Sequence, residues 1–243
     1  MLSNIIRLIK VFTLTAKYAR QVYRAKSHLS DPRSEIDKIK LEWARASLEN
    51  LKVELQVLGH PVTSESMMFI GNHLSYLDIP VVMAFAPVSF VAKVELSKWP
   101  VIGDACRSVG TVFVKRESVE SRKTVVTQIG EACLKEKQSI CIFPSGTTSL
   151  LEDKPWRRGA FEIAKTHQLK IQPFRLSYFP RRVAAFVDED AFIPHLWKLL
   201  KTQGVRVQIE FHSPVEVTDS QKACEQWQSW SREILELGET SKT

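Results

Sequence analysis

From residue 53 onward, short apolar segments of strand length alternate with longer segments of helical periodicity, and this alternation restricts the folds that the chain can adopt. Val53, Leu55 and Val57 alternate with polar residues and begin the series. Further strands are predicted at residues 67–70, 88–92, 111–114, 139–143, 170–176, 184–187 and 205–211. Helices are predicted at residues 79–85, 95–108, 121–137, 158–167, 195–203 and 219–237. Strands and helices that alternate in this way predict an α/β fold, with helices on the faces of a sheet.

Two helices are predicted ahead of the first strand. Asp31 and Pro32 are typical of an N-cap followed by a proline at the first helical position, and apolar residues then recur at helical spacing to Leu51. An earlier segment, residues 2–24, also has helical periodicity. We therefore divide the chain into an N-terminal helical region, residues 1–52, and an α/β domain, residues 53–243.

The basic residues are concentrated at the N-terminus. The whole chain has 34 Lys and Arg and 27 Asp and Glu, but six basic side chains and no carboxylate precede Asp31. The remaining residues are close to neutral, so the pI of about 9.2 does not indicate a basic surface for nucleic acid, and we expect no nucleic-acid partner. On a helical wheel of residues 2–24, most apolar side chains fall on one half and the basic side chains on an arc of the other.

This amphipathic pattern is typical of a helix that lies in the interface of an anionic membrane, so we expect a membrane lipid surface as a partner. Two alternatives remain open: the apolar face packs on the α/β domain, or the segment is a mitochondrial transit peptide. The longest runs without Lys, Arg, Asp or Glu, residues 79–92 and 138–151, are shorter than the ~18 to 20 apolar residues of a spanning helix. We therefore expect peripheral or monotopic membrane association and no transmembrane helix.

The four cysteines are scattered along the chain and form no Cys-x-x-Cys pair. No histidine lies near them at ligand spacing. This arrangement argues against a zinc site and against a disulfide scaffold, so we expect no metal and a reducing compartment.

The segment that follows the predicted strand at residues 67–70 can carry chemistry. It reads Gly-Asn-His-Leu-Ser-Tyr-Leu-Asp-Ile-Pro, with His73 at the strand's end and Asp78 five residues later. If the chain folds back, Asp78 accepts the imidazole N–H, and the other ring nitrogen is free to act as a base. Such a base accelerates proton removal from an alcohol by roughly 10² to 10⁴-fold. Taken alone, a helix-capping Asp beside a surface His is the more frequent explanation of this pair.

Further blocks follow in order and, together with His73-x4-Asp78, resemble the motifs of the glycerolipid and lysophospholipid acyltransferase family, whose type member is 1-acylglycerol-3-phosphate acyltransferase. They read FVAK at 90–93, GTVFVKR at 110–116, FPSGTTS at 143–149, and RGAF at 158–161 before IQP at 171–173. The resemblance covers about residues 51–217. It implies the fold of that family, a mixed α/β sheet flanked by helices, here with an N-terminal amphipathic helical appendage.

The resemblance also implies a reaction. A fatty acyl group would pass from a thioester, acyl-CoA or acyl-carrier protein, to a hydroxyl of a lysophospholipid-like acceptor, in phospholipid or membrane-lipid biosynthesis. His73 would be the general base and Asp78 would orient it. No Gly-x-Ser-x-Gly elbow is present, which agrees with direct transfer, and no cofactor is expected beyond the donor. Backbone N–H groups around Gly146 and Thr147 are candidate donors to the oxyanion.

Acceptor recognition is where the chain departs from the family pattern. The family associates an arginine of the second motif, and a Glu and an Arg of the third, with the glycerol phosphate of the acceptor. Arg116 is kept here, but the other two positions are Ser145 and Thr148. A hydroxyl does not replace a guanidinium in charge or geometry. The candidate substrate-binding residues are therefore Asn72, Lys93, Arg116, Ser145, Gly146, Thr147 and Thr148.

Two interpretations of this departure stay open. Either the acceptor lacks a terminal phosphate monoester, as in a lyso-aminolipid or a headgroup-bearing lysophospholipid, or Lys93, Lys115 and Arg157 take over the role of the missing arginine. A different class of function is a catalytically weak family member that acts as a peripheral lipid-binding protein. A soluble thioester donor would reach a membrane-bound enzyme from the cytosol, so we expect the protein on the cytoplasmic side of the membrane.

Overall fold

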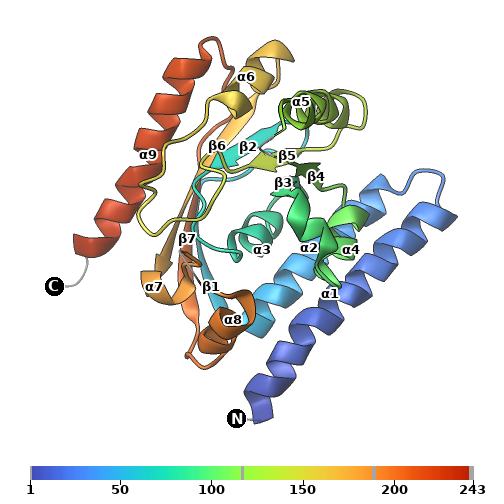
Figure 1. The fold of residues 1–243 in the computed structure, drawn as a ribbon, viewed down its shortest axis with the longest axis vertical. Coiled ribbons are helices and arrows are strands. Elements are labelled where there is room, and N and C mark those ends of the chain that lie inside the picture. Colours follow the sequence, from blue (N-terminus) through green and yellow to red (C-terminus); the bar gives the residue numbers. More distant parts are fainter. Residues whose placement is uncertain (1, 116–117, 188–189, 241–243) are drawn as a thin grey trace.

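A computed structural model describes residues 2–115, 118–187 and 190–240. In these ranges the centre of the fold is a seven-stranded sheet with the order β1-β7-β6-β2-β5-β3-β4 (Figure 1). The strands are β1 (Val53–Leu58), β2 (Met68–Gly71), β3 (Ser89–Lys93), β4 (Val112–Val114), β5 (Ile140–Ile142), β6 (Ile171–Phe179) and β7 (Val205–Phe211). The β6–β7 pair is antiparallel and the other neighbouring pairs are parallel. The predicted mixed α/β sheet is therefore confirmed.

Most helices lie where they are predicted, but one predicted helix is divided in two and the short helix α7 is not predicted. They are α1 (Leu2–His28), α2 (Arg33–Leu51), α3 (Asp78–Met83), the 3-10 helix η1 (Val94–Lys98), α4 (Ile102–Ser108), α5 (Val119–Leu134), α6 (Gly159–Thr166), α7 (Arg181–Ala184), α8 (Phe192–Leu200) and α9 (Ser220–Thr240). The single helix predicted at residues 95–108 is divided into η1 and α4. Pro100 lies at the break, and Val101 has a φ of 65°, which ends helical geometry there.

The strand predicted at residues 184–187 is wrong. Ala184 ends α7, and Phe186 donates its N–H to the carbonyl of Leu74, in the turn that follows β2. Ala184, Ala185 and Val187 are all buried. The segment is apolar because it packs over the end of the sheet. Burial of this kind selects the same apolar residues as a strand does, although the segment pairs with no strand in the described ranges.

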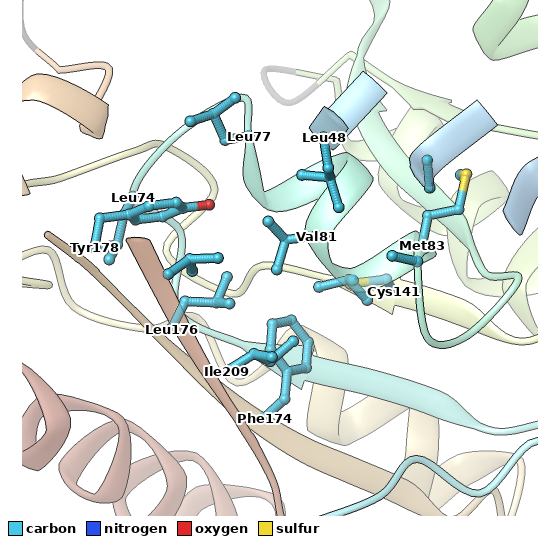
Figure 2. Packing of buried hydrophobic residues seen from close by; sticks show 14 of the residues in the cluster. Leu48, Leu74, Leu77, Val81, Met83, Cys141, Phe174, Leu176, Tyr178 and Ile209 are labelled. Atoms are coloured by element: carbon cyan, nitrogen blue, oxygen red, sulfur yellow. The ribbon is translucent and has the colours of Figure 1, made fainter. Parts of the chain in front are cut away.

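Helices cover both faces of the sheet, and β2 shows how its side chains divide between them. Phe69 joins a large cluster with residues of α2, α3, α8 and β7. Met68 and Ile70 point to the opposite face, where they join a second cluster with residues of α5, α6 and α9. Figure 2 shows part of the large cluster, in which Leu48 and Val81 pack over the sheet residues Phe174 and Ile209. The two-residue period of a strand therefore places one core on each face.

The N-terminal helices lie on the side of the molecule away from α9 (Figure 1). Three residues of α2, Ala44, Leu48 and Leu51, belong to the large cluster of the sheet domain. Helix α1 lies against α2, α4 and α8. The packing of α2 is thus continuous with the domain that was predicted to begin at residue 53.

Helix α1 packs on the protein through one face and exposes another. Arg7 donates to the carbonyls of Asn50 at 2.8 Å and Leu200 at 2.9 Å, so this basic residue docks the helix. Leu8 packs against the large cluster, as does Val11. The first turns nevertheless leave apolar side chains in solvent, with exposed fractions of 72% for Leu2, 39% for Ile5, 56% for Ile6 and 56% for Ile9. Within the described ranges, no helix has both the length and the apolar character needed to cross a bilayer.

Candidate active site

His73 and Asp78 lie together at the end of β2. The strand ends at Gly71, and α3 begins at Asp78, so the intervening turn folds the carboxylate back onto the imidazole. Nδ1 of His73 is 2.7 Å from Oδ2 of Asp78. The Asp78 side chain is 0% exposed and the His73 side chain 19% exposed. The contact puts the proton of a neutral imidazole on Nδ1 and leaves Nε2 as the nitrogen that can act as a base.

The Asp78 carboxylate is held by several hydrogen-bond donors. Oδ2 also accepts the backbone N–H groups of Leu74 at 2.7 Å and Ser75 at 3.0 Å. Oδ1 accepts the hydroxyl of Tyr178, from β6, at 2.7 Å. Burial, and then the charge of Asp78, raise the pKa of Tyr178 well above its ordinary value, so the phenol stays protonated and donates. Donors of this kind compensate the cost of removing a carboxylate from water.

The third motif lies directly beside His73. The ring of Phe143 stacks on the imidazole with centroids 4.1 Å apart and 8° between the planes. The backbone N–H of Ser149 donates to the carbonyl of His73 at 3.0 Å. The parallel pairing of β2 with β5 brings these segments together, because their carboxyl ends lie at the same edge of the sheet.

The Asn72 side chain is bonded to the neighbouring strand β6. Its side chain is 0% exposed, its Nδ2 donates to the carbonyl of Leu176 at 2.9 Å, and its Oδ1 accepts the N–H of Leu176 at 2.7 Å. The backbone pairing of β2 with β6 ends at Gly71 and Phe174. Beyond it, the side-chain amide of Asn72 bonds to the β6 backbone in place of a backbone peptide. A side chain buried in this way anchors the strand that precedes His73, and its predicted contact with substrate stays a prediction.

The turn of the third motif is formed by its own polar groups. The hydroxyl of Ser145, which is 6% exposed, donates to the carbonyl of Thr147 at 2.9 Å. Gly146 has a φ of 71°, and its N–H donates to the carbonyl of Phe143 at 2.9 Å. The Gly146 N–H is therefore used within the turn, and donation to an oxyanion from the N–H groups around Gly146 and Thr147 stays a prediction. Thr147 is exposed and Thr148 half-buried at the surface of this turn.

The basic residues proposed for acceptor binding lie at the same edge of the sheet. Lys93, at the end of β3, is paired with Val114 at the end of β4, and Lys115 follows directly. Arg157 donates its backbone N–H to the carbonyl of Pro144 in the third motif. All three of these cations are exposed. Arg116 lies outside the described residues.

Glu152 is a member of the site that the sequence did not indicate. Its side chain is 0% exposed; Oε2 accepts the backbone N–H of His73 at 3.3 Å, and Oε1 accepts the indole N–H of Trp156. Burial raises the pKa of Glu152 to about 7, although the hydrogen bonds from Trp156 and His73 oppose the shift. Glu152 and Asp153 are adjacent acidic residues in a loop, so nothing in the local sequence distinguishes the buried one from the exposed one.

Fold and site together define an α/β protein that carries a His–Asp pair at the carboxyl edge of a mixed sheet. A family model described as Acyltransferase matches residues 48–177, which is more than half of the chain. The chain therefore belongs to the acyltransferase family, and the protein is an acyltransferase.

Individual relatives are consistent with this assignment. The chain is 30% identical over 178 residues to a lyso-ornithine lipid O-acyltransferase of Pseudomonas aeruginosa, covering 71% of this chain and 68% of that protein. It is 28% identical over 188 residues to a 1-acyl-sn-glycerol-3-phosphate acyltransferase of Neisseria meningitidis serogroup B, covering 74% and 73%. The crystal structure of the 1-acyl-sn-glycerophosphate acyltransferase PlsC from Thermotoga maritima matches with a TM-score of 0.79 at 17% identity. That match covers 100% of this chain and 97% of the other, and it shows that the fold is shared.

Proposed function

We propose that this acyltransferase moves a fatty acyl group from a thioester donor, acyl-CoA or acyl-carrier protein, to the free hydroxyl of a lysolipid acceptor in membrane-lipid biosynthesis. The observation that carries the proposal is the 2.7 Å contact between His73 Nδ1 and the fully buried Asp78 carboxylate. Nε2 of His73 removes the hydroxyl proton as the acceptor oxygen attacks the thioester carbonyl. The carbon–sulfur bond then breaks, the new ester leaves, and the proton passes to the departing thiolate.

The surroundings of His73 suit this role. When Nε2 takes up the proton, the imidazolium is stabilised by the Asp78 charge, which Leu74, Ser75 and Tyr178 hold in place. The stacked ring of Phe143 restricts rotation of the imidazole. Transfer is direct, so the enzyme needs neither a nucleophile of its own nor a cofactor.

The acceptor we favour is a lysolipid without a terminal phosphate monoester, such as a lyso-aminolipid. Ser145 and Thr148 stand where the family pattern has a Glu and an Arg, so two charged groups are absent beside His73. The Pseudomonas relative is named for a lyso-ornithine lipid, which belongs to this chemical class. A lysophosphatidic acid acceptor is the second candidate, because Lys93, Lys115 and Arg157 are exposed at the same edge of the sheet.

We also place the enzyme on the cytoplasmic surface of a membrane, with α1 in contact with lipid. The first turns of α1 expose four apolar side chains, which would be buried among the lipids when the helix binds the membrane. These residues are Leu2, Ile5, Ile6 and Ile9. Lys10 and Lys17 on the same helix are exposed and add attraction to anionic headgroups, on the order of 1 kcal/mol each. An interfacial position gives access to an insoluble acceptor and to a soluble donor.

The test is a turnover assay of the full chain on liposomes, with acyl-CoA or acyl-carrier protein and a panel of lysolipids that differ in headgroup. The expected result is a diacyl product, detected by mass spectrometry, that His73→Ala does not form. If no acceptor gives product above the His73→Ala background, while the protein still binds liposomes, the role of a catalytically weak lipid-binding protein replaces the proposal.

A further inference from the structure

The C-terminal helix α9 holds the loop that follows the third motif. Gln228 accepts the backbone N–H of Trp156 at 3.2 Å and donates to the carbonyl of Lys154 at 2.9 Å. Arg232, one turn later on α9, donates from Nε to the carbonyl of Glu152 at 3.0 Å. Helix α9 lies beyond residue 177, where the match to the family model ends. A distant element therefore determines the path of the chain beside His73.

Within this loop, Glu152 extends its carboxylate to the peptide that carries the imidazole. Oε2 accepts the His73 N–H and Oε1 the Trp156 indole N–H, and no part of the Glu152 side chain reaches solvent. His73 is consequently held at its N–H by Glu152, at its carbonyl by Ser149, and at its ring by Asp78. Two of these contacts come from the loop at residues 149–152 and one from the start of α3, and together they define the position of Nε2.

Two features of Glu152 are unfavourable to folding and therefore need an explanation. Its backbone has a φ of 53°, in the left-handed region that non-glycine residues rarely adopt. Its carboxylate is buried near the like charge of Asp78, and burial raises the pKa of Glu152 to about 7. Unfavourable features of this kind persist where the surrounding contacts hold the residue in place, and they cluster at functional sites. Asp153, the next residue, is exposed and does not have a positive φ.

We propose that Glu152 is a positioning residue of the acyl-transfer site: its carboxylate fixes the His73 peptide so that Nε2 faces the acceptor hydroxyl, and Arg232 of α9 fixes Glu152. This proposal rests on the proposed role of His73 as general base. Glu152 touches neither substrate nor reacting atoms, so its effect is on the orientation of the base, and a misplacement of about 1 Å in such a group is sufficient to cost roughly 100-fold in rate.

The experiment compares Glu152→Gln and Glu152→Leu with the matched control Asp153→Asn, in the liposome assay and by thermal unfolding. Glutamine keeps one acceptor oxygen and leucine keeps none, so kcat is expected to fall about tenfold in Glu152→Gln and about 100-fold in Glu152→Leu, with KM of either substrate changed less than about twofold. Asp153→Asn keeps the wild-type kcat. A role in packing alone predicts the opposite order, because an apolar side chain of similar volume suits a buried site better than an amide.

A folded Glu152→Gln or Glu152→Leu protein with the kcat of the wild type overturns the inference. If neither variant folds, Arg232→Gln decides, with Lys222→Gln on the same helix as its control. Arg232→Gln is expected to lower kcat about threefold at unchanged KM, and an unchanged kcat overturns the inference. His73→Ala is measured in the same series. Loss of turnover in His73→Ala together with active Glu152 variants rejects this inference alone, whereas wild-type turnover in His73→Ala rejects the proposed function and this inference with it.

Discussion

The hydroxyl of Tyr178 donates to Oδ1 of Asp78 at 2.7 Å, although the two residues are 100 positions apart in the chain. Tyr178 lies on β6, the strand that pairs with β2 on the side away from β5. This contact joins the sheet to the His73–Asp78 pair and occupies the carboxylate oxygen that the backbone N–H groups of Leu74 and Ser75 leave open. Both oxygens of Asp78 are thereby held before any substrate binds.

Tyr178→Phe removes one donor to a buried carboxylate without changing the shape of the core. The free energy of unfolding is expected to fall by about 1 to 3 kcal/mol, the cost of leaving a buried charged group without one of its partners. kcat is expected to fall together with kcat/KM, because Asp78 acts on His73 in the transition state. Chemical denaturation and steady-state kinetics measure the two effects. Tyr23→Phe, at an exposed site, is the control, and equal stability of the two variants would contradict the prediction.

The stability of the protein is expected to depend on pH through Glu152. Its pKa of about 7 in the folded state is above the ordinary value of 4.5, because burial disfavours the charge. Between these two pH values the folded state binds more protons than the unfolded state, so the free energy of unfolding decreases as pH rises. The decrease amounts to roughly 3 kcal/mol across the window, at about 1.4 kcal/mol per pKa unit.

Glu152→Gln does not titrate and lacks this contribution. Relative to the wild type, it is therefore expected to gain stability as the pH of a urea denaturation series is raised from about 4.5 to about 8. Asp153→Asn, which changes the same charge at an exposed neighbouring position, is expected to run parallel to the wild type. A constant difference between Glu152→Gln and the wild type would show that Glu152 ionises as it does in solution.

Membrane contact through α1 is best tested by point substitutions. Deletion of the helix would uncover the surface beneath Leu8 and Val11 and remove the Arg7 contacts, so it would change the fold as well as the anchor. The double variant Ile6→Glu and Ile9→Glu alters exposed side chains only. Its cosedimentation with anionic liposomes is expected to fall at least tenfold, since it removes buried apolar area and adds repelling charge.

The control for the liposome experiment is Leu134→Glu, which introduces the same side chain on α5, at a residue that is 47% exposed. This variant is expected to sediment with liposomes as the wild type does. If the α1 double variant binds liposomes as strongly as the wild type, the enzyme contacts lipid through a surface other than α1.

Thr148→Arg restores the cation that the family pattern has in the third motif. A guanidinium at this half-buried position beside the basic edge is expected to raise kcat/KM for lysophosphatidic acid about tenfold relative to a lyso-aminolipid, because it offers a bidentate donor to phosphate. Thr148→Gln controls for side-chain length without the charge. An equal preference for the two acceptors in Thr148→Arg and the wild type would place headgroup recognition elsewhere in the site.

Sequence alone determined the features that depend on short stretches of chain. The two-residue and helical periods predicted the strands and helices of an α/β fold, and the turn from His73 to Asp78 is local, because five residues are enough to bring a carboxylate back to an imidazole. The pattern at residues 184–187 predicts a strand that the structure does not contain, because packing over the end of a sheet and pairing within a sheet both select apolar residues.

Only the tertiary structure decided which groups support that pair. Tyr178 bonds to Asp78 from 100 residues away, and Glu152 bonds to His73 from 79 residues away. The side chain of Asn72 bonds to the backbone of Leu176, at a separation of 104 residues. The order of the strands and the packing of α9 against the loop at residues 152–156 determine where these groups lie. Neither the strand order nor this packing is visible in a short stretch of sequence. A buried polar group is satisfied by whatever donor or acceptor the folded chain brings to it, so its partners are a property of the whole fold.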